Sequence, residues 1–301
     1  MRVRCGSGAS ASRCFGCYLS VMASACGAML TFLVTSANAQ TKLLPPEFGW
    51  YEAFAGAEAT TDAWLVYGGV TAAPFSKDIY SDGIRLRVAS GYGQYSYRGE
   101  RFIATLSRDP QIVKFHAETE FVDALVGYQM RFDALTAKVF VGVSAVNHAI
   151  APTDCFDHRV RDSHPTRYVP QCNPAGGFDF GIKGAIELWL NLDENSWMSL
   201  NLSYTTAHDT SAASFRQGYR ILPSLSIGPE FRYNRNSGSS RLDHEPEDSI
   251  PFQYNARAGG FVRYEWLNGE ASLAAGVATS MTELSHDRLE PYVSFSTALK
   301  F

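Results

Sequence analysis

The C-terminal segment Pro291–Phe301 alternates between two kinds of side chain. The odd-numbered positions carry most of the apolar groups: Val293, Phe295, Thr297, Leu299 and Phe301. The positions between them are small or polar. This period of two predicts a β-strand with one apolar face. Chain ends usually fray, so a terminal strand that stops on an aromatic residue is typical of the closing strand of an outer-membrane β-barrel. Phe301 is the predicted barrel-closing end.

The start of the chain resembles an export signal. Arginines precede the uncharged stretch Phe15–Val34, and Ala37 and Ala39 then provide an A-x-A cleavage site. The sequence predicts a cleaved signal peptide, residues 1–39, followed by one outer-membrane β-barrel domain, residues 40–301. The stretch is also long enough to be an uncleaved inner-membrane anchor, and Cys26 offers lipidation as a third interpretation.

Of the six cysteines, only Cys155 and Cys172 lie beyond residue 39. An even pair in an exported chain predicts one disulfide that closes a polar loop, with two free thiols as the alternative. The formal net charge of −4 gives no indication of a nucleic-acid partner. The mean hydropathy of −0.13 excludes a helical membrane protein, whereas a β-barrel turns only one face of each strand to lipid.

Strand-like segments follow one another after a short linker and number about twelve, as an even-stranded bacterial barrel requires. They lie near residues 48–60, 62–73, 83–97, 115–131, 133–148, 178–192, 197–208, 213–222, 225–235, 252–266, 271–281 and 289–301. From the fourth strand onward, short and long connections mostly alternate, which is typical of periplasmic turns and extracellular loops. Three connections do not follow this alternation. Those near Thr61 and at residues 209–212 are short for extracellular loops, and residues 74–82 are long for a periplasmic turn.

Charged residues within the strands share one parity, which predicts a polar face turned toward the barrel lumen. The lumen-facing candidates are Arg85, Arg87, Asp123, Lys183, Glu187, Glu230, Arg232, Arg257, Arg263 and Glu265. Aromatic residues of the opposite face are expected at the membrane interfaces, among them Tyr264 and Tyr292. A soluble β-sandwich would alternate in the same way but would turn its apolar face inward.

The charged face has two interpretations. It either lines a polar lumen that conducts or selects a solute, or it forms salt bridges that fill and close a narrow barrel. Barrels of the smallest size are filled by side chains and those near sixteen strands leave a channel, so about twelve strands is compatible with both. Tyr95 and Tyr97 share the parity of these charges. They either stack on sugar rings or belong to an extracellular hairpin, where they serve as girdle or packing residues.

Some outer-membrane barrels hydrolyse lipids through Ser and His, so catalysis is an alternative function. His148 and Ser144 share one face, but the sequence contains no G-x-S-x-G and no HExxH motif. The acidic and histidine side chains between residues 154 and 164 have irregular spacing, which favours a solvated loop over a cation site. We therefore expect no catalytic residue, no metal and no cofactor.

Two segments carry a family resemblance: Asp82–Tyr97 and Gly228–Tyr233. Together with Phe54–Glu58 and the aromatic C-terminus, they resemble the cellulose biosynthesis protein BcsS family of alphaproteobacteria. The resemblance spans nearly the whole mature chain. It implies an outer-membrane protein associated with bacterial cellulose synthesis, and it does not include the loop that contains Cys155 and Cys172.

Three hypotheses for the function follow. The first is a non-enzymatic accessory protein of cellulose or exopolysaccharide export or surface attachment, with a pore as one version. The second is a lipid-modifying outer-membrane enzyme. The third is a plugged barrel that acts as a surface adhesin or scaffold. The expected partners are outer-membrane lipid and either a glucan chain or other cellulose-synthesis components.

Overall fold

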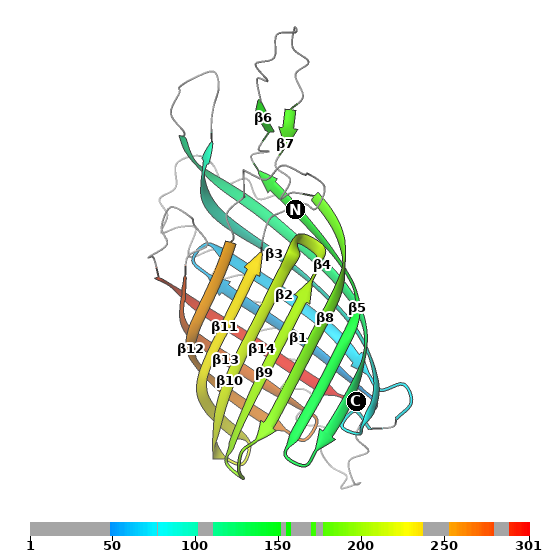
Figure 1. Cartoon of the computed structure of the whole chain (residues 1–301). Helices are drawn as coiled ribbons and strands as arrows, with labels where there is room; N and C mark the ends of the chain where they lie inside the picture. The colour runs from blue at the N-terminus through cyan, green and yellow to red at the C-terminus, as the bar shows by residue number, and fades with distance from the viewer. Residues whose placement is uncertain are drawn as a thin grey trace, which may run out of the picture. The chain divides into compact units, whose positions relative to one another are not determined.

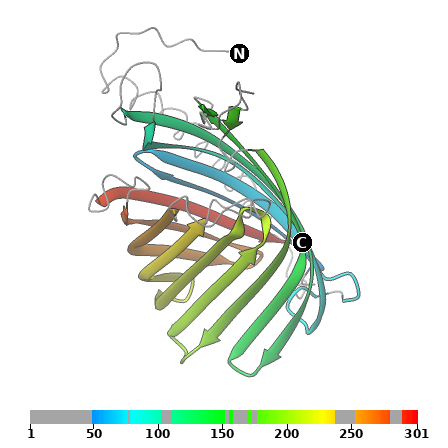
Figure 2. The same ribbon diagram turned by 45° about the horizontal axis from the view of Figure 1, so that its top comes forward.

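The computed structural model describes residues 49–76, 78–101, 111–151, 155–157, 170–172, 177–236, 253–279 and 289–301. These residues form a closed antiparallel barrel of twelve strands, in which the last strand pairs with the first (Figures 1 and 2). The strands are β1 (Tyr51–Thr60), β2 (Ala63–Ala72), β3 (Gly83–Arg101), β4 (Gln111–Phe132), β5 (Leu135–Ala151), β8 (Gly177–Asn191), β9 (Ser196–Thr205), β10 (Thr210–Leu222), β11 (Leu225–Asn236), β12 (Gln253–Trp266), β13 (Gly269–Thr279) and β14 (Leu289–Lys300). The predicted all-β, up-and-down barrel is confirmed.

The outer face of the barrel is apolar, and this decides between the two interpretations of the alternating strands. Val141, Phe180 and Ile182 are between 55% and 69% exposed, and most other strands also present Val, Ile, Leu or Phe outward. A soluble sandwich would bury these side chains between two sheets. Here they surround a barrel whose charged residues point inward, which is the arrangement of a barrel that crosses a lipid bilayer.

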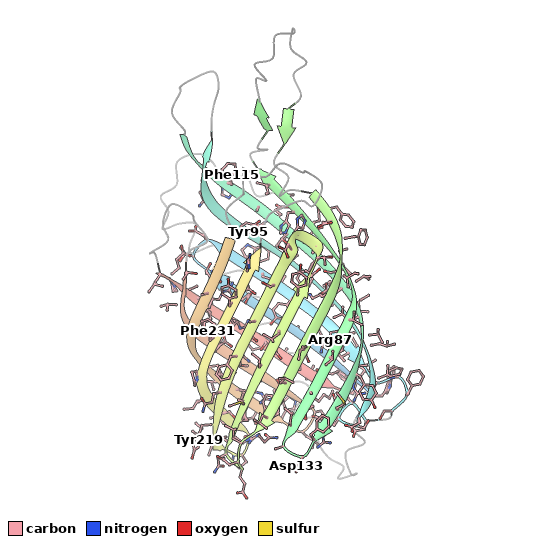
Figure 3. The ribbon with its side chains drawn as sticks, viewed as in Figure 1. Arg87, Tyr95, Phe115, Asp133, Tyr219 and Phe231 are labelled. Carbon is pink, nitrogen blue, oxygen red and sulfur yellow. The ribbon has the colours of Figure 1, made fainter. Side chains whose placement is uncertain are left out.

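The two ends of the barrel differ in their connections. At one end, which we call the turn end, the strands are joined by residues 73–82, 133–134, 192–195, 223–224 and 267–268. At the other, the loop end, the described short connections are residues 61–62 and 206–209. Within the β5–β8 connection, β6 (Cys155–Asp157) and β7 (Pro170–Cys172) form a separate two-stranded sheet. Figure 3 labels Asp133 and Tyr219 near the turn end and Tyr95 and Phe115 toward the loop end.

Strand boundaries differ from the predicted ones mainly at the loop end. β3 and β4 are longer than predicted, and β9 ends at Thr205, so that His208 lies in the 3-10 turn η1 (Ala207–Asp209) and not in a strand. His208 and Asp209 have φ angles of 48° and 43°, which a regular strand does not contain. The Tyr204 hydroxyl donates a hydrogen bond to the Asp209 carboxylate at 2.7 Å and stabilises this tight connection.

The turn between β8 and β9 shows how a short connection forms at the turn end. The Asp193 carboxylate accepts hydrogen bonds from the backbone N–H groups of Asn195 at 2.7 Å and Ser196 at 2.8 Å. Such a side chain replaces backbone partners that the reversing chain lacks. The same bonds, that from Asn195 above all, hold the pKa of the Asp193 carboxyl below its usual value because they favour its charged form.

Pairing of β1 with β14 closes the barrel. The two strands are in antiparallel register from Glu52 opposite Lys300 to Thr60 opposite Tyr292. Phe301 continues this pairing, since its backbone exchanges hydrogen bonds with Tyr51 at 3.2 and 2.9 Å and the two rings stack with centroids 5.2 Å apart. Among the described residues, no helix is both long and apolar enough to cross a membrane.

Candidate functional site: the barrel lumen

Five of the ten predicted lumen residues are buried, and the other five are partly buried. Arg85, Asp123, Glu230, Arg257 and Arg263 are 0%, 3%, 2%, 6% and 6% exposed, respectively. A water-filled channel would leave such side chains accessible from the inside. Their burial means that neighbouring side chains fill the lumen at these levels, as in the smallest barrels. Figure 3 labels Arg87 between the two ends of the barrel.

The largest ionic group, which we call the glutamate–arginine cluster, consists of Glu58, Arg216, Glu230, Arg232 and Arg257. Glu58 of β1 lies 2.6 Å from Arg257 of β12 and 3.2 Å from Arg232 of β11. Glu230 in turn pairs with Arg216 and, at 3.3 Å, with Arg232. β1 and β11 are separated in the barrel by β14, β13 and β12. The pair between Glu58 and Arg232 therefore connects strands that are not neighbours and spans part of the lumen.

A second ionic group centres on Glu187. Both terminal nitrogens of Arg87 donate to the two carboxylate oxygens, one of them at 3.0 Å, which is the bidentate arrangement of strong charge-assisted pairs. Lys138 approaches the same carboxylate at 3.8 Å. The Arg87 guanidinium also lies 4.0 Å from the Phe140 ring centroid. Since β4 and β5 separate β3 from β8 in the barrel, the Arg87–Glu187 pair also spans part of the lumen.

Two further ionic groups lie in the interior. Asp123 of β4 accepts hydrogen bonds from Ser144 and Lys183, both at 2.6 Å. Arg263 of β12 lies 2.6 Å from both Glu265 and Glu270. Its guanidinium is also 4.4 Å from the ring centroid of Trp189 on β8, four strands away around the barrel. Charges from separated strands thus meet in the lumen at several points, each with an opposite charge beside it.

At the turn end, the long connection between β2 and β3 packs against lumen side chains. Arg85 donates to the carbonyl oxygens of Ile79, at 2.9 Å, and Ser81. The Gln129 amide donates to the carbonyls of residues 79–81, at 2.9 to 3.3 Å. Lys300 of β14 lies 4.6 Å from the Tyr80 ring centroid. Residues 79–81 of this connection therefore contact side chains of β3, β4 and β14. The connection covers part of the lumen at this end, which accounts for its unexpected length.

Aromatic rings on the inner wall lie over glycines of the neighbouring strand. The register places Gly218 opposite Trp197, Gly127 opposite Phe140, Gly91 opposite Phe121 and Gly56 opposite Tyr67. A Cβ atom at any of these glycines would lie 2.2 to 2.4 Å from an atom of that ring. The glycines therefore provide the space in which each ring lies against the wall.

The structure places the ten sequence-predicted lumen residues as follows. It brings together Arg87 with Glu187, Asp123 with Lys183, Glu230 with Arg232, and Arg263 with Glu265. Arg257 pairs with Glu58, a residue that the sequence analysis did not predict in the lumen. Glu58 shares its parity with Glu52. The other face of the same strand carries Ala53, Ala55, Ala57 and Ala59. Arg85 binds backbone carbonyls and none of the other predicted residues.

The expectation for Tyr292 is wrong. It was expected at the membrane interface, but it is 3% exposed and its hydroxyl donates to Glu230 at 3.3 Å within the lumen. Its ring lies beside Gly276 of β13, where an added Cβ would be 2.8 Å from it. The position follows from the parity of β14, since Glu290 and Ser294 are also buried. Proximity to a strand end predicts a girdle position for an aromatic residue, but strand parity decides which face the residue occupies.

Ser144 and His148 do not form a catalytic pair. Ser144 donates its hydroxyl to Asp123, and four residues of extended strand separate the two positions, which is roughly 13 Å. The His148 ring instead packs edge-on against Tyr95 and His208, with centroids 6.4 and 4.7 Å away. Among the residues that the structure describes, no three His, Cys, Asp or Glu side chains are placed to hold a metal ion.

The long loop is described only in part. The backbones of β6 and β7 place Cys155 opposite Cys172 in antiparallel register. The disulfide between them stays a prediction. Asp154, His158, Asp162 and His164, considered above for cation binding, lie outside the described residues, as does the predicted signal peptide.

Several solved barrel structures are similar to this chain. The KdgM porin shares 8% identity, with 83% of this chain and 99% of the porin covered at a TM-score of 0.41. The translocator domain of the autotransporter NalP from Neisseria meningitidis shares 9%, with 94% and 98% covered at 0.45. The transport unit of the autotransporter AIDA-I from Escherichia coli shares 10%, with 87% and 93% covered at 0.43. These similarities are too distant to support an inference about activity or ligand.

Comparison of the sequence with known protein families is more informative than these structural similarities. No curated protein matches the chain. The family model of the cellulose biosynthesis protein BcsS, however, matches residues 53–301. This match extends from within β1 to the last residue of the chain, so it includes the strands that carry every ionic group of the lumen. The chain therefore belongs to the cellulose biosynthesis protein BcsS family.

Proposed function

We propose that the protein is a non-enzymatic accessory of cellulose export or surface attachment, built as a closed barrel in the outer membrane. Residues 1–39 direct export and are removed, and residues 40–301 form the barrel domain. The apolar outer face supports insertion into lipid, with the turn end toward the periplasm and the loop end toward the exterior. Family membership supports the connection with cellulose.

The observation that carries the closed-barrel version is the set of contacts between separated strands. Glu58 with Arg232, Arg87 with Glu187, and Arg263 with Trp189 connect strands three or four positions apart in the barrel. A glucan chain that passed through the part of the lumen that these contacts span would have to separate the partners and leave largely buried charges unpaired. Breaking a buried pair costs about 3–5 kcal/mol. The resting protein therefore acts through its surfaces rather than as an open conduit.

Planar-bilayer recording of the purified mature protein tests the closed lumen. We expect no steady conductance from the wild-type protein. The double variant Arg87→Ala/Glu187→Ala, which removes one spanning pair together with both of its charges, is expected to show conductance steps. A stable open conductance from the wild-type protein would contradict the closed lumen and favour the pore.

A deletion strain tests the role in cellulose. We expect membranes of this strain to retain glucan synthesis, while cellulose displayed on the cell surface falls and is restored by the wild-type gene. Loss of synthesis itself would contradict a role in export or attachment. The lipid profile of a His148→Ala strain, compared with wild type, addresses the enzymatic alternative, and an altered profile would contradict the non-enzymatic proposal.

A further inference from the structure

The connection between β9 and β10 folds into the barrel mouth. The Thr206 backbone N–H donates to the Ile182 carbonyl at 3.0 Å, and the Thr206 hydroxyl accepts from the Ile182 N–H at 2.9 Å, so that the turn η1 is attached to β8. Gly181 of β8 lies under the turn, since an added Cβ atom there would be 2.1 Å from the Ala207 nitrogen. Gly181 faces the lumen, as does Ser144 opposite it. The turn therefore covers part of the inner wall at the loop end.

The His208 side chain of this turn packs against the inner wall. Its ring lies edge-on to the ring of His148 on β5, with centroids 4.7 Å apart, and His148 lies edge-on to Tyr95 of β3 at 6.4 Å. On β4, between these strands, the uncharged Thr119 lies opposite His148. His208 is 9% exposed and His148 is partly buried. We call His148 and His208 the histidine pair.

Two ring nitrogens of the histidine pair are buried and have no hydrogen-bond partner among the described residues. They are Nδ1 of His148 and Nε2 of His208. In a neutral imidazole one nitrogen only accepts, whereas in an imidazolium both nitrogens are donors. A buried charged donor without an acceptor is strongly disfavoured, and a second charge on the adjacent ring adds repulsion. The packed position of η1 therefore suits two neutral rings.

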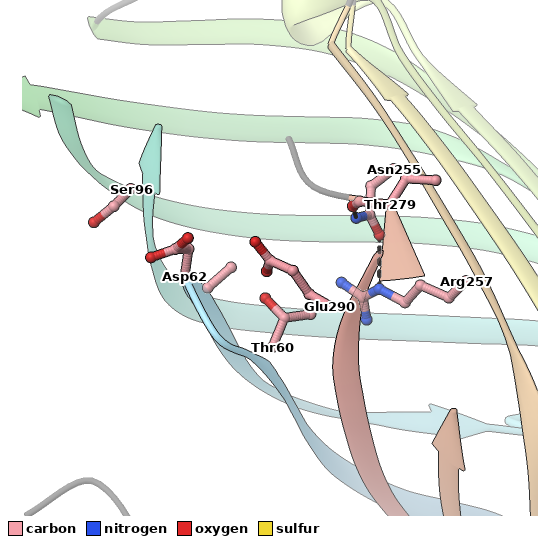
Figure 4. A pocket seen from close by; sticks show the side chains of 8 residues that line it. Thr60, Asp62, Ser96, Asn255, Arg257, Thr279 and Glu290 are labelled. Atoms are coloured by element: carbon pink, nitrogen blue, oxygen red, sulfur yellow. Dashed lines mark hydrogen bonds between the residues drawn. The ribbon is translucent and has the colours of Figure 1, made fainter. Parts of the chain in front are cut away.

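Polar groups on another side of the mouth have their partners. Arg257 donates to the Asn255 side-chain oxygen at 2.7 Å, and the Asn255 amide donates to the Thr279 carbonyl at 2.7 Å (Figure 4). Arg257 also lies 2.6 Å from Glu58. These groups hold one another in place whatever the solution contains. The histidine pair differs, because its two buried nitrogens can gain protons but have no acceptor.

The ionisable groups that face the histidine pair are engaged elsewhere. From β8, the Asp179 carboxylate accepts the His208 backbone N–H at 2.8 Å. From η1, Asp209 accepts the Tyr204 hydroxyl at 2.7 Å. From β3 comes the Tyr95 side chain, and phenols are neutral in the range in which histidines titrate. Neither carboxylate bonds the two unpartnered nitrogens, so no counter-charge stabilises a proton there.

A metal ion is the other ligand that histidine nitrogens commonly take. Even the zinc sites that keep an open position have three protein ligands. Among the residues that the structure describes, no three His, Cys, Asp or Glu side chains could hold a metal ion. The chemistry that remains for the pair is the uptake of protons.

We propose that the histidine pair is a pH-sensitive switch that holds η1 against the inner wall while both rings are neutral. When the solution at the loop end becomes acidic, the rings take up protons from it and repel each other, and His208 leaves the wall together with η1. His208 and Asp209 have φ angles of 48° and 43°, which few residues other than glycine adopt without support from their surroundings, so the turn relaxes once that contact is lost. This response to pH goes beyond the proposed function and does not depend on it.

Nuclear magnetic resonance of the mature protein in lipid nanodiscs tests the proposal between about pH 7.5 and about pH 4.5, where histidines titrate. The readout is the hydrogen-exchange protection of the Thr206 amide, which bonds Ile182 in the folded turn. It is compared with the Tyr204 amide, so that the ordinary pH dependence of exchange cancels. We expect the ratio to fall about tenfold or more on acidification, because a tenfold difference in proton affinity between the two states shifts their equilibrium tenfold. The change should reverse at neutral pH.

Three variants identify the groups that take up the protons. His148→Phe keeps a ring beside His208 and removes one proton site, so the acid loss of protection should become smaller. His148→Phe/His208→Asn has no proton site and should show no acid loss, and asparagine tolerates the positive φ of position 208. His116→Gln is the matched control, since His116 is exposed on the outer face of β4 and its loss should leave the transition unchanged.

Two results would overturn the proposal. The first is protection of the Thr206 amide that stays constant down to about pH 4.5 in the wild type. The second is an acid loss in His148→Phe as large as that in the wild type. The second result decides even if the double variant fails to form the turn at neutral pH, because the single variant retains His208.

Discussion

Substitution of Glu58 by alanine is expected to be among the most destabilising changes in the lumen. The variant removes the carboxylate that lies 2.6 Å from Arg257 and 3.2 Å from Arg232. Arg232 keeps Glu230 as a partner, whereas the one side-chain hydrogen bond that Arg257 keeps among the described residues is with Asn255. The Arg257 side chain, which is 7% exposed, then stays buried without its carboxylate partner. Loss of one partner from such a pair costs about 3–5 kcal/mol of unfolding free energy.

The assay is urea unfolding of the barrel in lipid vesicles, followed by tryptophan fluorescence. Asp62→Ala is the matched control, because it removes an acidic side chain from the same hairpin. Its ion pair with Lys114 is exposed, so the expected cost is about 0–1 kcal/mol. The double variant Glu58→Leu/Arg257→Met removes both charges and should recover most of the loss.

The reasoning would be refuted if Glu58→Ala and Asp62→Ala had the same small effect on the unfolding free energy. That result would mean that water reaches Arg257 in the folded barrel and solvates its charge. The closed lumen would then lose its main support. A large loss in Glu58→Ala that the double variant does not recover would show that packing of the glutamate side chain, and not its charge, is responsible.

Three further predictions concern the wall, the lipid face and the long loop. Gly218→Ala places a Cβ atom 2.2 Å from the Trp197 ring, so it should destabilise the barrel by about 1–3 kcal/mol in the same urea assay. Val141→Arg places a charge in the middle of the apolar stretch of β5 and should cost about 2–4 kcal/mol in vesicles. In the protein isolated from outer membranes, Cys155 and Cys172 should react with a maleimide only after reduction, as read by mass spectrometry.

Each of these predictions has a control within the chain. Gly184→Ala adds a Cβ whose nearest contact is 4.0 Å away, so it should leave the unfolding free energy nearly unchanged. Phe75→Arg changes a side chain that is 83% exposed in the β2–β3 connection, and a cost as large as that of Val141→Arg would contradict the assignment of the lipid face. Maleimide labelling of either cysteine without reductant would contradict the disulfide.

The twelve strands were predictable because alternation has a period that only a strand matches. The closing segment Pro291–Phe301 and the charges of β12 all fall on the predicted parity. Turn chemistry was less informative. The predicted strand boundary at His208 is wrong because His208 and Asp209 both have positive φ. His and Asp are among the non-glycine types enriched at positive φ, but the enrichment is too weak to predict two successive such residues.

The partners of the lumen charges were less predictable than their direction. Parity indicates that Arg257 points inward, but which carboxylate it meets depends on the shear and diameter of the barrel, which bring β12 toward β1. Tyr292 is a second example. Its residue type suggested a position at the membrane interface, whereas the parity of its strand places it in the lumen. Register and curvature are properties of the closed sheet and are not encoded in any one strand.

The pairing of β1 with β14 has a consequence for the assembly of the barrel. The two strands that form it are the first and last of the domain, so the contact with the greatest separation along the chain is also the one that completes the sheet. A nascent chain that lacks residues 289–301 would carry two unpaired edges, each a template for pairing with other chains. Every earlier hairpin must therefore be kept from aggregating until the final strand has left the ribosome and reached the membrane.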